Sequence, residues 1–304
     1  MLNEIRDLEK YKRKIILKKI SPKDFTIVHK NLECILNIYK TLNKDKTITK
    51  YLNKNINTTI KTVYENINTL KKVIEENLDL KISKNIDDIT IEKLGNNDIE
   101  AILYINRGLS DDIDGLYKKT LDTKEEFFCI KNYLNDILCK YEKNTKTNDY
   151  VKIHETSKSD PILLTTKRRS TIIKKYFEDQ KNDIVKIEYV SKFTGNNEIY
   201  NLNIKDIEFL NYSGSTTNIC ITSNSIKKMT TFINTSKNNL INKLEEFYND
   251  FVKKVINIEL IGIINYVTYL DILQCKSYIA FEYNYCKPEI KDYYKSFINF
   301  KGYK

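Results

Sequence analysis

Two long segments repeat apolar residues at alternating spacings of three and four, and this pattern constrains the fold most. The first runs from Ser110 to about residue 143, and its later apolar stripe is Phe127, Ile130, Leu134, Ile137 and Tyr141. The second runs over 226–255, with Ile226, Met229, Ile233, Leu240, Leu244, Phe247, Phe251 and Val255. Such spacing marks one face of an amphipathic helix. We therefore predict two helices, the first about 50 Å long, that pair antiparallel as a stalk.

Between these segments the apolar period changes from 3.6 to 2, which is typical of strands. Val185, Ile187 and Tyr189 alternate with charged residues, and 199–204, 207–210 and 219–221 are also strand-like. Turns are expected at 195–197 and 213–215. This pattern predicts a small β-rich module at the far end of the stalk.

Helices are also predicted on both sides of the stalk. Ser21, Pro22 and Asp24 form a capping-box pattern ahead of an apolar stripe that ends at Leu42. A second stripe over 48–74 predicts a longer helix. The predicted fold class is mainly α. Its domains are a helical core (1–108), a descending helix (109–147), the β-rich insert (148–224), an ascending helix (225–256) and a return to the helical core (257–304).

The chain of 304 residues shows no pattern of enzyme chemistry. It has no phosphate-binding G-x-x-x-x-G-K-[ST] motif, and its six Cys and two His lack zinc spacing. Asp111, Asp112 and Asp114 could form a cation site, but acids in the first turn of a helix capped by Ser110 are the favoured interpretation. We therefore expect no enzymatic activity, no cofactor and no metal in this chain.

The absence of a signal peptide or an apolar stretch of membrane-spanning length in this sequence favours an intracellular protein without a membrane partner. The cytoplasm, the nucleus or a viral factory are the expected locations.

Basic residues exceed acidic ones, giving a formal net charge of +10. Residues 165–176 contain five basic side chains and no acid, and 225–244 contain four Lys and no acid. Cations of this kind neutralise phosphates without reading bases. The alternative is a solvated surface in a Lys-rich chain. The candidate DNA-binding residues are Lys167, Arg168, Arg169, Lys174, Lys175, Lys192, Lys227 and Lys228. Tyr176, Phe177 and Phe193 could stack on bases, although core packing is favoured.

Four short motifs, in order along the chain, resemble the MutS family of DNA mismatch-repair proteins. Residues 7–9 (Asp-Leu-Glu) with Arg13 and 21–25 (Ser-Pro-Lys-Asp-Phe) are similar to the start of its core domain. Residues 105–108 with 112–116 resemble the start of its descending lever helix. Residues 266–273 and the Cys-Lys-Pro at 286–288 resemble its segments before the ATPase domain. Residues 152–175 are most similar to the divergent branch of giant viruses and octocoral mitochondria.

The resemblance implies a core domain, paired lever helices and a clamp that grips duplex DNA through backbone phosphates. It also implies ATP and Mg²⁺ in an ATPase domain outside this chain, and a dimer formed mostly through that domain. The mismatch-reading domain and its F-x-E motif are absent from this sequence, so we expect a partial middle section or a reduced relative. The alternative function is a helical scaffold or tether whose stalk binds a protein partner and no nucleic acid.

Overall fold

The computed structural model describes residues 2–56, 59–95, 97–142, 149–156, 159–213, 215–285, 288–290, 292 and 298. Its contacts divide the chain into two compact units. Unit 1 contains Met1–Leu8, Asn31–Asn68 and Glu259–Lys304; unit 2 contains Glu9–Lys30 and Thr69–Ile258. The predicted helical core, 1–108 with 257–304, is thus divided between both units. The motif at 286–288, apart from Pro288, and the last residues 302–304 lie outside the described residues.

Unit 1 is helical. It holds η1 (Leu2–Glu4), the later turns of α2 (Pro22–Leu42), α3 (Lys46–Asn55), the first half of α4 (Ile60–Asn77) and α11 (Ile261–Glu282). Tyr39 on α2 stacks on Tyr64 of α4, with ring centroids 4.7 Å apart. The prediction of one helix over 48–74 is wrong, because the backbone is extended at Ile56. The amide oxygen of Asn53 accepts a hydrogen bond from the Ile60 N–H (3.0 Å), and so caps the new helix.

Unit 2 begins with α1 (Leu8–Ile16) and the first turns of α2. The predicted capping box is present: the Asp24 N–H donates to Ser21 Oγ and the Ser21 N–H donates to Asp24 Oδ2, both at 3.1 Å. Lys14 Nζ also lies 2.7 Å from the Asp24 carboxylate. Short helices follow: α5 (Leu80–Ser83), α6 (Ile91–Leu94) and α7 (Ile99–Ile102).

Two long helices, α8 (Asp111–Tyr141) and α10 (Asn224–Ile256), form the predicted antiparallel pair. Near the start of α8, Asp112 lies 3.3 Å from Lys243 Nζ. Two turns later, the Lys119 ammonium lies 4.9 Å from the centroid of the Phe232 ring. Contacts that advance along α8 while receding along α10 require opposite helix directions. Ser110 occupies the N-cap position of α8 without a side-chain capping bond.

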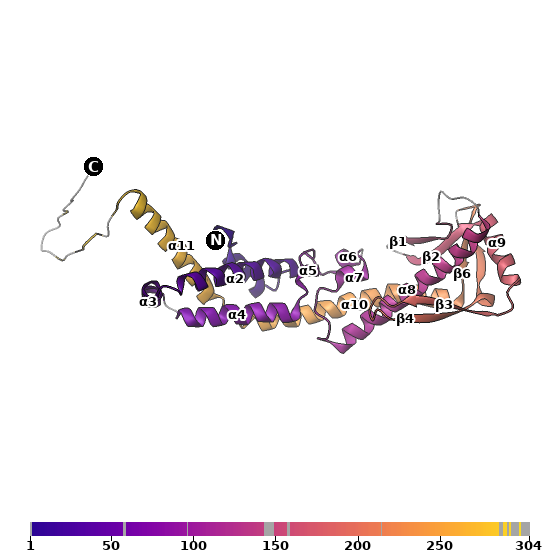
Figure 1. The fold of residues 1–304 in the computed structure, drawn as a ribbon, viewed down its shortest axis with the longest axis horizontal. Helices are drawn as coiled ribbons and strands as arrows, with labels where there is room; N and C mark the ends of the chain where they lie inside the picture. Colours follow the sequence, from indigo (N-terminus) through magenta and orange to yellow (C-terminus); the bar gives the residue numbers. More distant parts are fainter. Residues whose placement is uncertain are drawn as a thin grey trace. The chain divides into compact units, whose positions relative to one another are not determined.

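A β-rich module separates these helices in sequence, and Figure 1 shows its strands beside α8 and α10. The main sheet is antiparallel, in the order β1 (Lys152–Thr156), β2 (Ser159–Thr166), β6 (Asn218–Thr222) and β5 (Glu208–Asn211). β3 (Ile184–Val190) and β4 (Asn197–Asn203) form a separate hairpin, and η2 (Ile204–Asp206) follows it. The prediction of a mainly α fold with a small sheet module is confirmed. Strands β1 and β2 and the helix α9 (Lys167–Glu178) were not predicted from the sequence.

One apolar core joins the module to the long helices. Phe127 and Leu134 of α8 and Ile226 of α10 belong to the same buried cluster as Leu163 of β2 and Ile221 of β6. The two β-strand residues are also direct neighbours across the antiparallel ladder. Because these side chains are at most 3 % exposed, the module cannot move on the helix ends without uncovering apolar surface.

Candidate nucleic-acid interface

The helix α9 carries five of the eight candidate DNA-binding residues. Ser170 and Ile173 are buried on its inner face, and α9 packs against β2, β6 and α8. Its first residue is tied to the start of β6, where the Lys167 N–H donates to the Thr217 carbonyl (3.0 Å). Helical spacing then directs Lys174 and Lys175 away from that face, and both are exposed.

The lysines of α9 are largely unpaired. The exposed side chains of Lys167 and Lys175 form no ion pair within the described residues. The Lys174 ammonium lies 5.1 Å from the centroid of the Phe209 ring on β5, a cation–π contact that leaves its charge uncompensated. Three lysine charges on α9 are therefore available to an anion.

Cations also gather where α9 begins, which is unfavourable for an isolated helix. Lys167, Arg168 and Arg169 occupy the first turn, which contains no acid, and Thr166 makes no side-chain capping bond. The N-terminus of a helix carries a partial positive charge, so acids are favoured there and cations are not. The module as a whole is nearly neutral, with eleven basic and ten acidic residues over 149–222. Its positive charge is thus concentrated on α9.

The two arginines share one carboxylate. Glu142, at the C-terminal end of α8, accepts from Arg168 Nη2 (3.2 Å) and from Arg169 Nε (3.4 Å). The Glu142 side chain is only 10 % exposed. The Arg169 guanidinium also lies 4.5 Å from the centroid of the Tyr150 ring. Arg169 is therefore a link between α9 and α8, whereas Arg168, with an 80 % exposed side chain, still faces solvent.

Lys227 and Lys228 lie in the first turns of α10. Ser223 caps this helix through its Oγ, which accepts from the Ile226 N–H at 3.1 Å. Lys227 Nζ lies 4.0 Å from Glu208 of β5, with both side chains 60 % exposed. Lys228 is exposed and has no ion pair within the described part of the chain. As with α9, cations stand at the start of a helix without an acid in its first turn.

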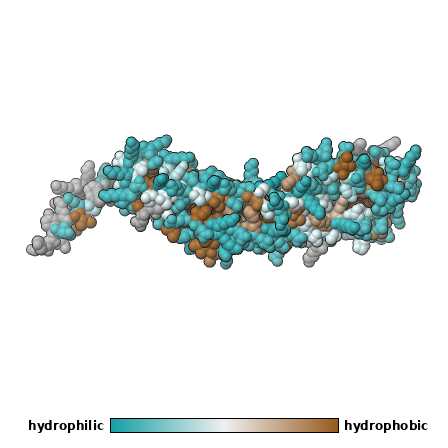
Figure 2. Space-filling view, turned by 90° about the horizontal axis from the view of Figure 1, so that it is seen from below, coloured by the Kyte–Doolittle hydropathy of each residue, from teal (hydrophilic) through white to brown (hydrophobic). Residues whose placement is uncertain are grey.

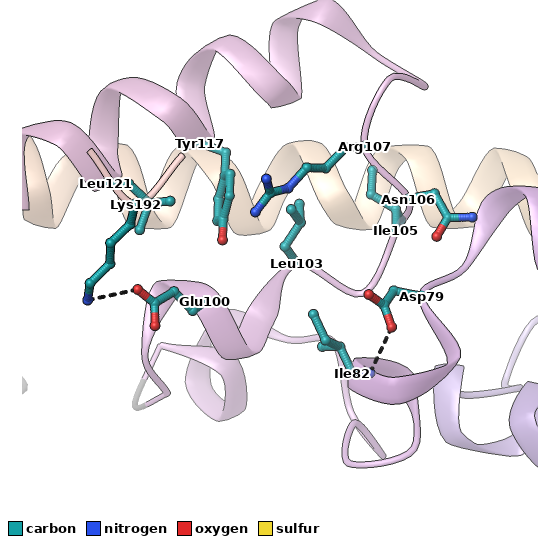
Figure 3. Close-up of a pocket in the computed structure, with 10 residues that line it drawn as sticks. All are labelled: Asp79, Ile82, Glu100, Leu103, Ile105, Asn106, Arg107, Tyr117, Leu121 and Lys192. Atoms are coloured by element: carbon teal, nitrogen blue, oxygen red, sulfur yellow. Dashed lines mark hydrogen bonds and ion pairs between the residues drawn. The ribbon is translucent and has the colours of Figure 1, made fainter. Parts of the chain in front are cut away.

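Lys192 lies elsewhere and is not free. It follows β3 and reaches Glu125 of α8 (2.9 Å) and Glu100 of α7 (3.0 Å). These carboxylates raise the pKa of Lys192 to about 12. Figure 3 shows its side chain extended toward Glu100 at one side of a pocket of about 510 Å³. Lys192 therefore fastens the β3–β4 hairpin to the helices and is not grouped with the cations of α9.

The same pocket holds Arg107, which sequence reasoning did not select. Its guanidinium lies 5.4 Å from the Tyr117 ring and 5.0 Å from the Phe193 ring. Asp79, on the opposite wall in Figure 3, caps α5 by accepting from the Lys81 and Ile82 N–H groups. The charged groups of this pocket are thus engaged in holding α5, α8 and the hairpin together.

The remaining candidates have structural partners. Tyr176 and Phe177 pack against the buried cluster of the module, and Phe193 packs on Tyr117. These surroundings agree with core packing, the interpretation favoured over base stacking. The acids at 111, 112 and 114 lie in the first turn of α8 as expected. Asp112 pairs with Lys243, and Asp114 accepts from the Gly108 N–H at 2.6 Å.

A scan against protein-family models and a search of curated proteins gave no match. Among the described residues, no single helix has the length and apolarity needed to cross a membrane, and α10 and α11 meet that test only when taken together. The face in Figure 2 is mostly hydrophilic, with separate hydrophobic patches.

Proposed function

We propose that the chain is a DNA-binding clamp and lever segment of a MutS-like mismatch-repair protein, gripping backbone phosphates of duplex DNA. The observation that carries the proposal is the concentration of positive charge on α9. Lys167, Lys174 and Lys175 have no acidic partner among the described residues, and the uncapped start of the helix carries two arginines as well. Phosphate oxygens are anions that such cations and the N-terminus of a helix stabilise.

The lever part of the proposal rests on how the module is attached. Because Phe127 and Leu134 of α8 belong to the core of the module, a shift of α8 along its axis would shift the module with it. By the resemblance to MutS proteins, the driving movement would come from an ATPase domain that holds ATP and Mg²⁺ and mediates dimerisation. This chain itself would be non-catalytic and intracellular.

The test removes the three free lysines of α9 together. We expect Lys167→Ala/Lys174→Ala/Lys175→Ala to weaken binding to any duplex about equally. The log–log salt slope should fall by up to about 2.7, at about 0.9 per phosphate contact. Fluorescence anisotropy with one duplex at several salt concentrations measures both quantities.

The matched control removes the same number of exposed lysines from unit 1, at Lys40, Lys44 and Lys50. It should change the slope much less. Equal losses from the two triple variants would indicate diffuse charge attraction and refute the clamp. Adding Arg168→Ala to the α9 variant tests whether the exposed arginine contributes one further contact.

A scaffold or tether without nucleic-acid binding is the second candidate function. It is favoured by the apolar residues that α11 exposes, among them Phe281, which is 84 % exposed. A scaffold predicts little duplex binding and little salt dependence in the same titration.

A further inference from the structure

The helix α11 has two different faces. Its inner face is buried in unit 1 through Ile263, Tyr266 and Leu270. Beyond Leu270 no side chain of α11 is buried, although this stretch contains Ile272, Tyr278, Ile279 and Phe281. An exposed helix surface of this composition is unusual for a chain whose other long helices bury their apolar stripes.

The outer face has a regular spacing. Six exposed residues follow one another at intervals of four, three, four, three and four: Ile261, Asn265, Thr268, Ile272, Cys275 and Ile279. This is the a/d seam of a coiled coil over about three heptads. With Asn265 at a, Ile272 and Ile279 are also a positions. Ile at a favours two strands, and one Asn at a fixes register and orientation.

The charges beside the seam fit a second copy of the same helix. In this heptad frame Asp271 occupies g and Lys276 occupies e; both are exposed. Residues five apart do not face each other on one helix, so the two cannot pair within the chain. Between two parallel helices in register, however, a g residue lies beside the e residue five positions later in the partner. Asp271 and Lys276 would then form two symmetric ion pairs.

We propose that α11 pairs with α11 of a second copy as a parallel, in-register, two-stranded coiled coil. In such a dimer each seam residue meets its own copy. Ile272 and Ile279 bury apolar surface against themselves, and the two Asn265 amides can hydrogen-bond to each other. Thr268 and Cys275 at d pack less well than Leu, so the dimer is reversible. The interface uses residues outside the proposed DNA-binding surface.

Sedimentation velocity on the full chain, over a concentration series and without DNA, tests the dimer. We expect a monomer–dimer equilibrium that Ile272→Asp weakens at least about tenfold, because the seam would then bury two carboxylates. The matched control is Ile199→Asp on β4, where the isoleucine is 56 % exposed and lies outside the seam. It should leave the equilibrium unchanged. A chain that stays monomeric throughout, or equal losses from both variants, would overturn the proposal.

Charge reversal tests the orientation. Asp271→Lys and Lys276→Asp should each weaken the dimer by placing like charges together, and the double variant should restore it. An antiparallel pair does not align these positions in this way. If the double variant dimerises as weakly as the single variants, the parallel register is wrong.

Cys275 provides a covalent readout of the same geometry. Two thiols facing each other at d form one S–S bond when a copper–phenanthroline oxidant removes two electrons and two protons. We expect a band at twice the 36.0 kDa chain mass that survives heating in denaturing gel electrophoresis and disappears when dithiothreitol is added. Cys275→Ser should abolish it, whereas Cys139→Ser, at another exposed thiol, should not. Persistence of the band in Cys275→Ser would contradict the register.

Discussion

Replacing Glu142 by Gln should strengthen duplex binding, because this carboxylate holds both arginines at the start of α9. Its oxygens accept from Arg168 Nη2 at 3.2 Å and from Arg169 Nε and Nη2 at 3.4 Å. If both guanidinium groups then contact phosphate, the log–log salt slope steepens by about 1.8. Over a fourfold rise in salt, the affinity of the variant would fall about 12-fold more than that of the parent chain.

The same change should cost little stability. Arg168 is 80 % exposed at its side chain, so solvent screens most of its attraction to Glu142. Arg169 is 26 % exposed and contributes more. We expect the free energy of unfolding to fall by about 1 kcal/mol, measured by urea titration. The variant therefore remains folded while its DNA binding is compared.

The control is Glu178→Gln, which makes the same change in net charge in the last turn of α9. Glu178 is exposed and has no ion pair within the described residues, so its removal frees no arginine. Anisotropy titrations of both variants at two salt concentrations should show the steeper slope only for Glu142→Gln. An unchanged slope in that variant, or the same change in both, would refute the assignment of α9 to phosphate contact.

Three further predictions concern stability. Leu134→Ala opens a cavity in the core shared by α8 and the β-rich module and should cost about 2–5 kcal/mol in urea titration; the exposed Leu210→Ala should cost far less. Asp24→Ala removes half of the capping box and should lower the free energy of unfolding by about 1–2 kcal/mol, detected as a lower Tm in calorimetry. Burial raises the pKa of the Glu126 carboxyl above its ordinary 4.5, so ionisation at neutral pH opposes folding. Glu126→Gln should therefore raise the Tm at pH 7, and this gain should vanish as the pH falls below about 4.5; a gain that grows on acidification would contradict the sign.

The helices of this fold could be predicted where an apolar stripe is long and regular. The apolar stripes that end at Tyr141 and at Val255 lie on α8 and α10, since burial of one face decides helix formation there. The break at Ile56 was missed because the apolar stripe continues through it, whereas the Asn53 side chain that caps the next helix is not part of the stripe. The helix α9 was missed because its first turn is basic and its buried residues are few.

The partners of the candidate site residues could not be read from the sequence. Glu142 and Arg169 are 27 residues apart, and Lys192 pairs with Glu100, 92 positions earlier. Each pair depends on where separate elements pack, which no local pattern encodes. The run of basic residues at 167–175 therefore located the positive charge, but it predicted neither the helix that carries this charge nor which cations are free. Lys167 and Lys175 are exposed and form no ion pair within the described residues, whereas Arg169 and Lys192 are each paired with a carboxylate.

The contacts around Glu142 also determine how a force on α9 would be transmitted to the helices. Arg169 ties the start of α9 to the end of α8, and the Tyr176 ring lies 6.5 Å from the Tyr141 ring on α8. Nearby, Asn135 Oδ1 of α8 accepts from the Tyr150 N–H at 2.7 Å, just before β1. These contacts all join the module to the last two turns of α8. A force applied to phosphate-bound α9 would therefore act on α8 directly, before it reached α10 through the shared core. Cutting the Arg169–Glu142 link with Glu142→Gln should loosen that coupling even as it strengthens DNA binding, so affinity and transmission should change in opposite directions.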